Sequence, residues 1–380
     1  MDVSNFRLLP LSFYHEGSRT IASLSPADTY LATSPTEPGN PPSVLESIYP
    51  PIQVRAFDNV EAVEFSSALL RRNTVYIPDY CETHQDTSVH ETFFLIKHTP
   101  ERVALTLKGA PPRGWNGIML FQIGAFNWYH WLIEILPMAF LAERLPDQYA
   151  FYPFIIPQKV AQIETFRDSL GLFLNGRKIS LIDEKGCLFK ELIVIDPIAN
   201  GPYNLRDGFW PTKEMFSYNP KLLMEFRNAI LERLHIQQKE QSELIFLARE
   251  NDRRAFNQDE IENIAIRHGF RLVYMEKLSF REQVELMFRA KIIVGASGAA
   301  FSNILFCQKG ARVLSWLLPQ YRGFSSFSNL AHAVGAEMRY IFSEPHQLVE
   351  STQQAYRAKY HLDPAVFEDA LNRSIHAENF

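Results

Sequence analysis

The sequence predicts an α/β protein with two domains, and three observations support this prediction. Short β-branched and aromatic runs alternate with segments of helical apolar spacing along most of the chain. The 380 residues are 46% hydrophobic and include 29 phenylalanines, which is enough apolar material for two globular cores. Between Asp196 and Pro220 the composition changes to Pro, Gly, Asn and Tyr, which is typical of a connection between domains.

The N-terminal segment, residues 1–60, is expected to consist mostly of loop. Eight of the 23 prolines lie between Pro10 and Pro51, in a background of Ser, Thr and Gly. We therefore expect a proline-rich segment over residues 1–60, a first α/β domain over residues 61–205 and a second domain over residues 206–380.

The first domain is predicted to begin with strands and then to alternate strands with helices. Pro137 lies in the middle of the first predicted helix and should kink or divide it, because proline lacks the N–H group that a helix interior needs. The predicted strands are Thr74–Ile77, Thr92–Lys97, Arg102–Leu107, Gly117–Ile123, Phe154–Ile156, Ile179–Ile182 and Leu192–Ile195, and the predicted helices are Asn127–Arg144 and Val160–Leu170.

The second domain is predicted to be Rossmann-like. Its strands are separated by helices of about ten residues, a spacing that indicates right-handed crossovers and a parallel sheet. The predicted strands are Leu244–Ala248, Arg271–Met275, Lys291–Gly295 and Ala311–Leu317, and the predicted helices are Lys221–Leu234, Gln258–His268, Phe280–Arg289 and Gly298–Phe306.

Charge and cysteine content exclude several classes of protein. The formal net charge of −5 gives no reason to expect a nucleic-acid partner. Cys81, Cys187 and Cys307 stand too far apart for a zinc motif or a disulfide framework, so we expect no metal site and a reducing compartment. No secretion signal and no apolar run of about 18 residues is recognisable, which favours a cytoplasmic protein.

A glycine turn in the second domain is a candidate anion site. The predicted strand Lys291–Gly295 is followed by Ser297, Gly298 and Ala299, which open a helix. Small residues let a ligand approach the backbone, and the free N–H groups of a helix N-terminus attract anions. The alternative is that these residues are small only because a tight turn must pack.

Arginines follow the strand Leu244–Ala248 at its carboxyl end, where open α/β sheets bind ligands. Arg249, Arg253 and Arg254 could each form the bidentate contacts that phosphate groups favour. The alternative is a solvated loop in which these arginines pair with neighbouring acidic side chains.

Polar residues stand at the starts of the next two predicted helices and after the strand between them. Asn257 is expected to cap the next helix, with Glu260 completing a capping box. Ser279 and Glu282 are expected to form a second capping box. Glu276 follows the next strand and either bonds a ribose or sugar hydroxyl or caps a turn.

A histidine and a glutamate in the first domain are candidate catalytic residues. His130 and Glu134 stand four residues apart, so a helix places them on one face within reach of each other. A carboxylate beside an imidazole can orient it, raise its basicity or act as the base itself. The alternative is a histidine packed among Trp128, Tyr129 and Trp131 as ordinary core material.

Four strings, taken together in their order and spacing, resemble glycosyltransferase family 61. The resemblance implies a GT-B-like architecture in which two Rossmann-like domains face a cleft, with the acceptor on the first domain and the donor on the second. It also implies inverting transfer from a nucleotide-sugar co-substrate, which we expect to be UDP-linked, without a tightly bound cofactor or an Asp-x-Asp metal site. The strings are Asn127–Pro137, Leu247–Asn257, Glu276–Gln283 and Val294–Asn303.

The resemblance carries roles onto matching residues and departs from the family at one of them. His130 is expected to be the base and Glu134 its orienter, although the reverse assignment fits the spacing equally well. Ser297 stands where the family usually has histidine, so that histidine's role cannot be transferred to this chain. The residues expected to hold the donor are Arg249, Arg253, Arg254, Asn257, Glu276, Ser297, Gly298, Ala299 and Asn303.

The missing membrane anchor makes the chain similar to bacterial cytoplasmic members that build capsule or other surface polysaccharides. The expected partners are a nucleotide sugar and a glycan or lipid-linked glycan acceptor, with peripheral association to a membrane polysaccharide assembly complex. The main alternative is a catalytically silent subunit that binds nucleotide or glycan in such a complex. A second is another phosphate-handling enzyme of the same architecture.

Overall fold

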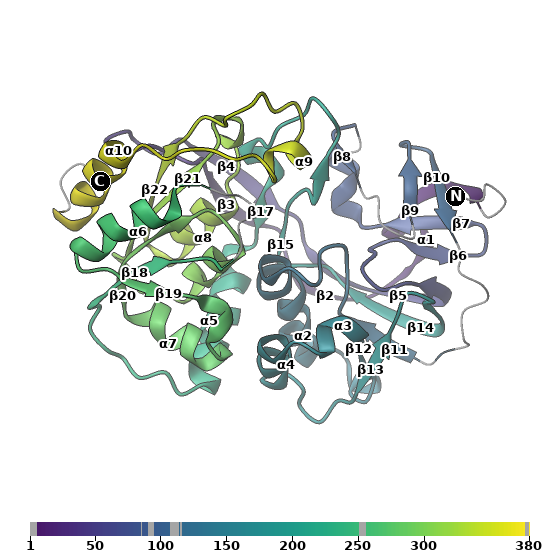
Figure 1. Ribbon diagram of the computed structural model, residues 1–380. Coiled ribbons are helices and arrows are strands. Elements are labelled where there is room, and N and C mark those ends of the chain that lie inside the picture. Colours follow the sequence, from purple (N-terminus) through teal and green to yellow (C-terminus); the bar gives the residue numbers. More distant parts are fainter. Residues whose placement is uncertain are drawn as a thin grey trace. The chain divides into compact units, whose positions relative to one another are not determined.

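The computed structural model describes residues 6–84, 86–89, 95–106, 114, 116–250, 256–376 and 380. The chain forms two compact units, shown in Figure 1: the first contains Met1–Asp28 and Tyr49–Asn204, and the second contains Thr29–Ile48 and Leu205–Phe380. Both units contain helices and strands, which confirms the predicted α/β class.

The expectation that residues 1–60 are mostly loop is wrong. These residues contribute five strands, and most of the eight prolines lie in the connections between the strands. A proline cannot donate to a sheet ladder, so it is favoured at such connections. The composition therefore indicated where strands end rather than the absence of strands.

The first unit is built on a mixed sheet of eleven strands. In the order β13-β12-β11-β14-β5-β6-β7-β1-β10-β9, the first four strands are mutually parallel, and β14 pairs antiparallel with β5. The Rossmann-like part of this unit is therefore four strands wide. The strands are β1 (Phe6–Phe13), β2 (Arg19–Ser25, paired with β5), β5 (Ile52–Ala62), β6 (Leu69–Arg71), β7 (Thr74–Ile77), β9 (Leu95–His98), β10 (Arg102–Thr106), β11 (Asn116–Met119), β12 (Phe154–Pro157), β13 (Ile179–Ile182) and β14 (Cys187–Ile195).

The predicted helix Asn127–Arg144 runs on past Pro137 without a break, but its type changes just before this proline. A π-helical turn over His130–Ile135 precedes α2 (Leu136–Leu141), and the Leu136 N–H donates to the carbonyl of Trp131, five residues earlier. The extra residue in this turn adapts the helix to a proline that cannot donate. The predicted helix Val160–Leu170 is divided into α3 (Gln158–Ala161) and α4 (Glu164–Gly171).

The remaining elements of the first unit are short. They are α1 (Tyr14–Gly17), β8 (Ser88–Val89), β15 (Ala199–Asn200) and the 3₁₀ helices Asp79–His84, Ala142–Arg144 and Asp147–Tyr149; β16 (Asn204–Leu205) lies at the boundary between the two units.

The second unit confirms the predicted parallel sheet. Five strands lie in the order β19-β18-β20-β21-β22, and every neighbouring pair is parallel. Numbered within this sheet, the order is 2-1-3-4-5, and its direction of winding changes between β18 and β20. The strands are β18 (Glu243–Leu247), β19 (Arg271–Val273), β20 (Ala290–Ala296), β21 (Arg312–Leu317) and β22 (Glu337–Phe342).

The helices of the second unit form two groups, visible in Figure 1: α6 packs with α10, whereas α5, α7 and α8 pack with a 3₁₀ helix over Ala299–Phe306. The sequence predicted that last helix, but not α8, β22 or α10. The helices are α5 (Pro220–Arg233), α6 (Gln258–Arg267), α7 (Phe280–Arg289), α8 (Ser326–Val334), α9 (Thr352–Ala355) and α10 (Pro364–His376), and the short elements are β3 (Asp28–Thr33), β4 (Val44–Tyr49), β17 (Ser217–Tyr218) and the 3₁₀ helices Lys213–Met215, Met275–Lys277 and Pro319–Tyr321.

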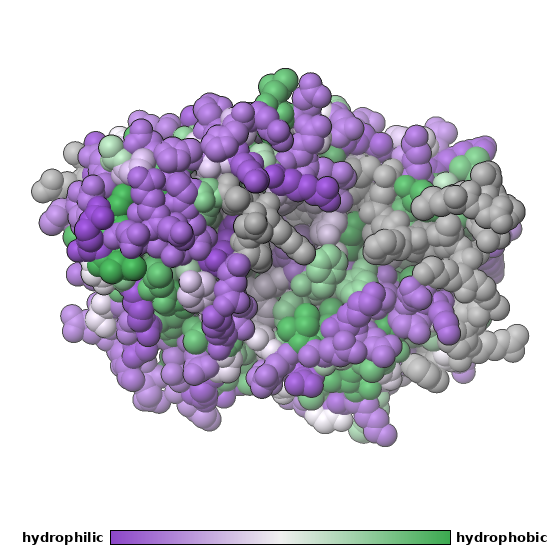
Figure 2. Space-filling model, viewed as in Figure 1, coloured by the Kyte–Doolittle hydropathy of each residue, from purple (hydrophilic) through white to green (hydrophobic). Residues whose placement is uncertain are grey.

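The surface drawn in Figure 2 is largely hydrophilic, with hydrophobic residues gathered in separate patches. Among the described residues, no helix combines the length and the apolar character needed to cross a membrane.

Candidate functional site

A buried acid–imidazole pair lies beyond the carboxyl end of β11. The π-helical turn holds both predicted catalytic residues, and Nδ1 of His130 lies 2.8 Å from Oε2 of Glu134. The Glu134 side chain is 5% exposed and that of His130 is 15% exposed. The structure therefore brings the two residues into direct contact, as the spacing predicted.

Gln122 extends this pair into a three-residue array that the sequence analysis did not identify. Its amide Nε2 donates to Oε2 of Glu134, the oxygen that also faces His130. When Glu134 is ionised, its Oε2 has no proton to give, so Nδ1 of His130 is the donor in the second contact. A neutral His130 then carries its lone pair on Nε2, which is the arrangement that a general base requires. The only signal in the sequence was a glutamine inside an apolar predicted strand.

A glycine leaves the space that the histidine ring occupies. Gly124 adopts a φ of +81°, and a Cβ atom built there would lie 2.6 Å from both Cδ2 of His130 and Cε2 of Tyr203. The rings of His130 and Tyr203 pack with centroids 5.2 Å apart. Gly124 is therefore required both by its backbone conformation and by the space that these rings occupy.

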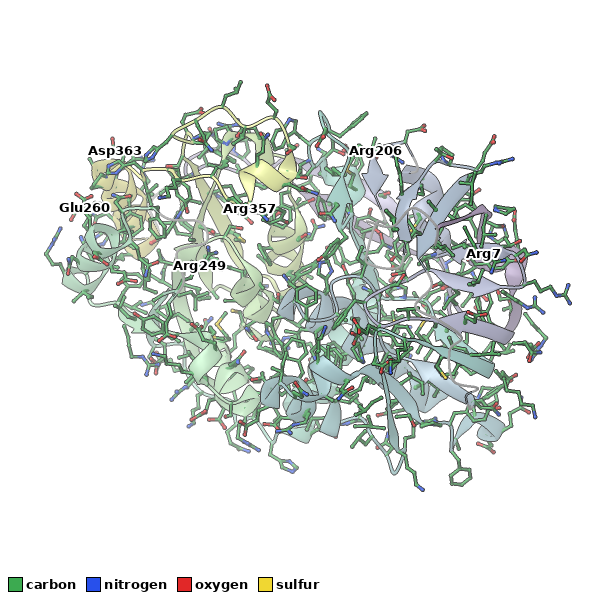
Figure 3. All side chains as sticks on the ribbon, turned by 45° about the vertical axis from the view of Figure 1, so that its right-hand side comes forward. Arg7, Arg206, Arg249, Glu260, Arg357 and Asp363 are labelled. Atoms are coloured by element: carbon green, nitrogen blue, oxygen red, sulfur yellow. The ribbon has the colours of Figure 1, made fainter. Side chains whose placement is uncertain are left out.

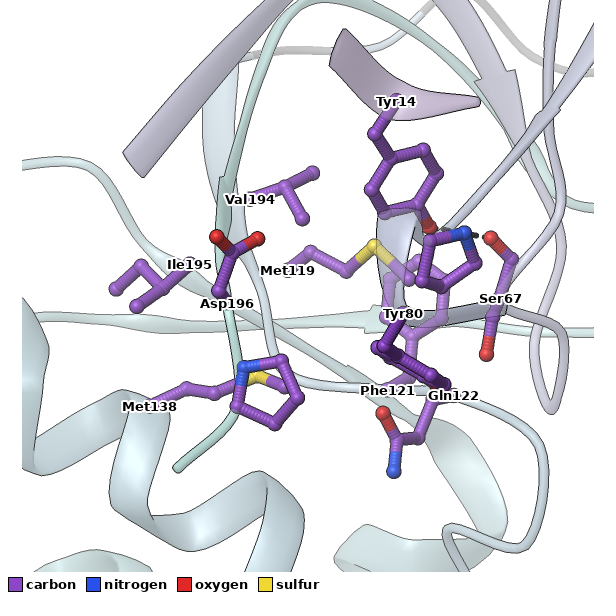
Figure 4. A pocket seen from close by; sticks show the side chains of 12 residues that line it. Tyr14, Ser67, Tyr80, Met119, Phe121, Gln122, Met138, Val194, Ile195 and Asp196 are labelled. Atoms are coloured by element: carbon purple, nitrogen blue, oxygen red, sulfur yellow. Dashed lines mark hydrogen bonds between the residues drawn. The ribbon is translucent and has the colours of Figure 1, made fainter. Parts of the chain in front are cut away.

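Beside the array, the first unit encloses a cavity of about 20 Å³, shown in Figure 4, which is room for about one water molecule. Gln122, Tyr80 and Asp196 are among its lining residues. Asp196 directly follows β14, the parallel neighbour of β11, so it reaches the same edge of the sheet as Gln122.

The ionisable groups around this cavity are strongly affected by burial. Burial raises the pKa of Asp196 to about 6, while the Arg55 guanidinium, 3.6 Å away, acts in the opposite direction. The pKa of the Tyr80 phenol is raised as well. Burial is the largest cause, and the charges of Cys81 and Glu134 act in the same direction. Tyr80 is thus electrostatically coupled to Glu134 and stays neutral.

In the second unit, Arg249 and the glycine turn meet at the switch point of the sheet. Arg249 follows β18, and Ser297 follows the neighbouring strand β20. The Arg249 guanidinium donates to the carbonyl of Ala296 at 2.7 Å and to the carbonyl of Ser297. Ligands of open α/β sheets bind at this position.

Gly298 is needed because of Arg249 rather than because of its own backbone. Its φ of 175° is available to any residue, but a Cβ atom there would lie 2.3 Å from the guanidinium Nη2. Ala299 begins the 3₁₀ helix directly after Gly298. The turn is therefore shaped around an arginine, which places a cation beside the first N–H groups of the helix.

Asn303 lies inside this helix and is fully buried. Its Nδ2 donates to the carbonyl of Ala300 at 3.1 Å, whereas its Oδ1 has no hydrogen-bond partner among the residues that the structure describes.

Asn257 does not form the expected capping box. Its amide instead brackets Leu362, donating to the Leu362 carbonyl at 3.0 Å and accepting from the Leu362 N–H at 2.9 Å. Its Nδ2 also contacts Glu260 at 2.7 Å. The side-chain oxygen that would have capped the helix instead accepts the hydrogen bond from the Leu362 N–H.

Three further residues, Glu276, Arg253 and Arg254, were predicted to bind the sugar donor. Glu276 is exposed in the 3₁₀ helix that follows β19, at the same sheet edge as Arg249. Arg253 and Arg254 lie outside the described residues. Arg249 and Glu260, on either side of that part of the chain, are labelled in Figure 3.

About half of the chain is similar to a known protein family. Residues 128–314 match the family model of Glycosyltransferase 61, a range that contains His130, Glu134, Arg249 and the glycine turn. No curated protein matches the chain. The match makes this part of the chain similar to glycosyltransferase family 61, and that family implies glycosyltransferase activity.

Proposed function

We propose that the protein is an inverting glycosyltransferase that moves a sugar from a nucleotide-sugar donor to a hydroxyl group of a glycan acceptor. The observation that carries this proposal is the array of His130, Glu134 and Gln122, found in a chain that matches a glycosyltransferase family. As part of the same proposal, the two units form a GT-B architecture, with the acceptor on the first unit and the donor on the second.

In the proposed reaction, Nε2 of His130 accepts the proton of the acceptor hydroxyl as its oxygen attacks the anomeric carbon. The bond from that carbon to the nucleoside diphosphate breaks, and the diphosphate leaves with the electron pair. Glu134 stabilises the imidazolium ion that forms, and Gln122 fixes the carboxylate in the orientation that this requires. Attack opposite the leaving group inverts the anomeric configuration.

The second unit is proposed to bind the donor. The Arg249 guanidinium donates to the carbonyls of Ala296 and Ser297, which holds its charge at the carboxyl edge of the sheet. Its charge, with the N–H groups near Gly298 and Ala299, would stabilise the departing diphosphate by electrostatic preorganisation. We keep Arg253, Arg254, Asn257, Glu276 and Asn303 as proposed donor contacts.

We further propose a cellular role in bacterial capsule or other surface polysaccharide synthesis. In this role a UDP-linked sugar is the donor, the acceptor is a glycan or lipid-linked glycan, and the protein acts in the cytoplasm or at the inner face of the membrane. The sequence resemblance supports this role.

The test has two stages. A thermal-shift screen against UDP, GDP and their sugar conjugates identifies the donor, because a ligand at 100 times its Kd stabilises a fold by about 2.7 kcal/mol. Diphosphate release is then measured with that donor and a panel of oligosaccharide acceptors, and NMR of the product gives its anomeric configuration.

We expect diphosphate release that depends on the acceptor, and a product of inverted configuration. Binding without release would identify the silent subunit instead, and a retained configuration would overturn the inverting mechanism. Release that accompanies a different product would indicate another phosphate-handling enzyme.

A further inference from the structure

Two phenylalanine rings meet at the surface of the first unit, close in the chain to His130. The rings of Phe65 and Phe126 pack edge to face with centroids 5.4 Å apart. Phe126 remains 56% exposed and stands two residues after Gly124, the glycine that contacts the His130 ring. A single exposed phenylalanine is ordinary, but an exposed ring packed on a second one, four residues before the proposed base His130, needs a reason.

The backbone at Phe65 supports a functional reason. Phe65 has a φ of +55°, in the left-handed region that bulky residues rarely adopt. Such strain is costly, and it persists mainly where the position of a side chain matters to function. Holding Phe65 in this conformation is what places its ring against Phe126.

Polar groups border the same pair. Lys159 lies over the Phe65 ring, with Nζ 5.7 Å from the ring centroid and 3.6 Å from Oε1 of Glu64. The Lys159 side chain is 70% exposed, whereas that of Glu64 is 5% exposed. The other Glu64 oxygen, Oε2, has no hydrogen-bond partner in the part of the chain that the structure describes.

We propose that Phe65 and Phe126 form a stacking subsite for a pyranose ring of the acceptor. One face of a pyranose carries C–H bonds that pack on an aromatic ring, while its hydroxyl groups need hydrogen-bonding groups at the edge. Lys159, which is 70% exposed and faces Glu64, supplies such a group beside the rings. The inference rests on the proposed function, and it assigns the substrate-binding surface that the base alone does not define.

The chain offers a matched control for testing this subsite. Phe151 is 92% exposed and lies just before β12, whereas Phe126 lies after the parallel neighbour β11. The two phenylalanines are therefore associated with opposite edges of the same sheet. Phe126→Ala removes the proposed platform, Phe126→Tyr preserves a ring, and Phe151→Ala removes a still more exposed ring from elsewhere.

The first measurement is saturation-transfer NMR without donor, using the methyl glycosides of glucose, galactose, mannose, xylose and N-acetylglucosamine. We expect at least one glycoside to receive saturation through its C–H face. Phe126→Ala should weaken that binding roughly tenfold, equivalent to about 1.4 kcal/mol. Phe126→Tyr and Phe151→Ala should bind as the wild type does. No contact with any glycoside, or equal losses in both alanine variants, overturns the subsite.

The second measurement separates this inference from the proposed function. In the transfer assay, Phe126→Ala should raise KM for the acceptor while diphosphate affinity stays unchanged. Normal transfer with an unchanged acceptor KM rejects the subsite and leaves the transferase proposal intact. Glycoside binding that depends on Phe126, in a protein that releases no diphosphate from any donor, supports the subsite and rejects the transferase.

Discussion

Nδ1 of His130 lies 2.8 Å from Oε2 of Glu134, and the same carboxylate oxygen accepts the amide hydrogen of Gln122. We take this shared oxygen as support for the proposed roles, with Glu134 as the orienter and His130 as the base. An oxygen that accepts from two donors is an orienting group, so His130 is the better candidate for the base. Histidine is also the side chain that most often serves as a general base.

We expect His130→Ala to lower kcat by about 10² to 10⁴, the usual effect of losing a general base. Diphosphate affinity, measured by calorimetry, should stay near that of the wild type. Glu134→Gln should lower kcat less, because a glutamine oxygen can still accept from Nδ1. His332→Ala, at an exposed histidine of α8, is the control and should have no effect. Normal turnover in His130→Ala with loss in Glu134→Gln would exchange the roles.

Gly124→Ala should damage both stability and activity. Forcing alanine into the left-handed region costs about 1 kcal/mol, and the added Cβ atom would also push against the rings of His130 and Tyr203. Gly176→Ala is a matched control, since Gly176 has a φ of +79° and nothing within 4 Å of its Cβ position. Urea unfolding should show a similar loss of stability from the backbone strain in both variants. The kcat should fall only in Gly124→Ala. Equal turnover would show that Gly124 does not position the histidine.

Local patterns were the most predictable part of this fold. The helix α7 has the predicted bounds, and the capping box of Ser279 and Glu282 forms as expected. The strands β7 and β13 also coincide with their predicted ranges. These features depend on residues a few positions apart, so their sequence periodicity is sufficient to define them.

Features that depend on distant partners were not predictable. Asn257 looked like a helix cap, but it binds the backbone of Leu362, more than a hundred residues away. Gln122 can donate to Glu134 only because the chain after β11 places its side chain against the helical turn that carries Glu134. In the same way, the contact between Arg249 and the glycine turn requires β18 and β20 to be neighbours.

Arg249 and Gly298 should show strong coupling in a double-mutant cycle. Arg249→Ala should weaken diphosphate binding by roughly ten- to a hundredfold, because hydrogen bonds to charged groups contribute about 1.5 to 3 kcal/mol. Gly298→Ala should also be harmful, since its Cβ atom would meet the guanidinium. In the Arg249→Ala background the same glycine change should be nearly neutral. Additive effects on unfolding and on UDP affinity would show that the arginine does not shape the turn.

Ser297→Ala tests how much of the anion site depends on a side chain. If the backbone N–H groups and Arg249 supply most of the binding, the loss in UDP affinity should correspond to about 0.5 to 1.5 kcal/mol, the contribution of one neutral hydrogen bond. Ser297 is 5% exposed, so the stability of the variant must be measured alongside its affinity. Complete loss of turnover in a well-folded Ser297→Ala protein would show that the hydroxyl has a catalytic role.

Asp196 should make the stability of the protein fall as the pH rises from about 4 to about 6. Burial raises its folded pKa from 3.8 to about 6, so within this range the folded state holds a proton that the unfolded state has released. The stabilisation is fully present below the unfolded pKa and is lost as the pH passes the folded pKa. Asp196→Asn keeps an oxygen to accept from the Gln53 N–H but cannot titrate. Urea unfolding of both proteins between pH 4 and pH 7 should therefore show the stability of the variant rising relative to the wild type up to about pH 6, and then levelling. A difference that stays constant with pH, or that changes in the opposite direction, would mean that Arg55 outweighs burial and keeps Asp196 ionised.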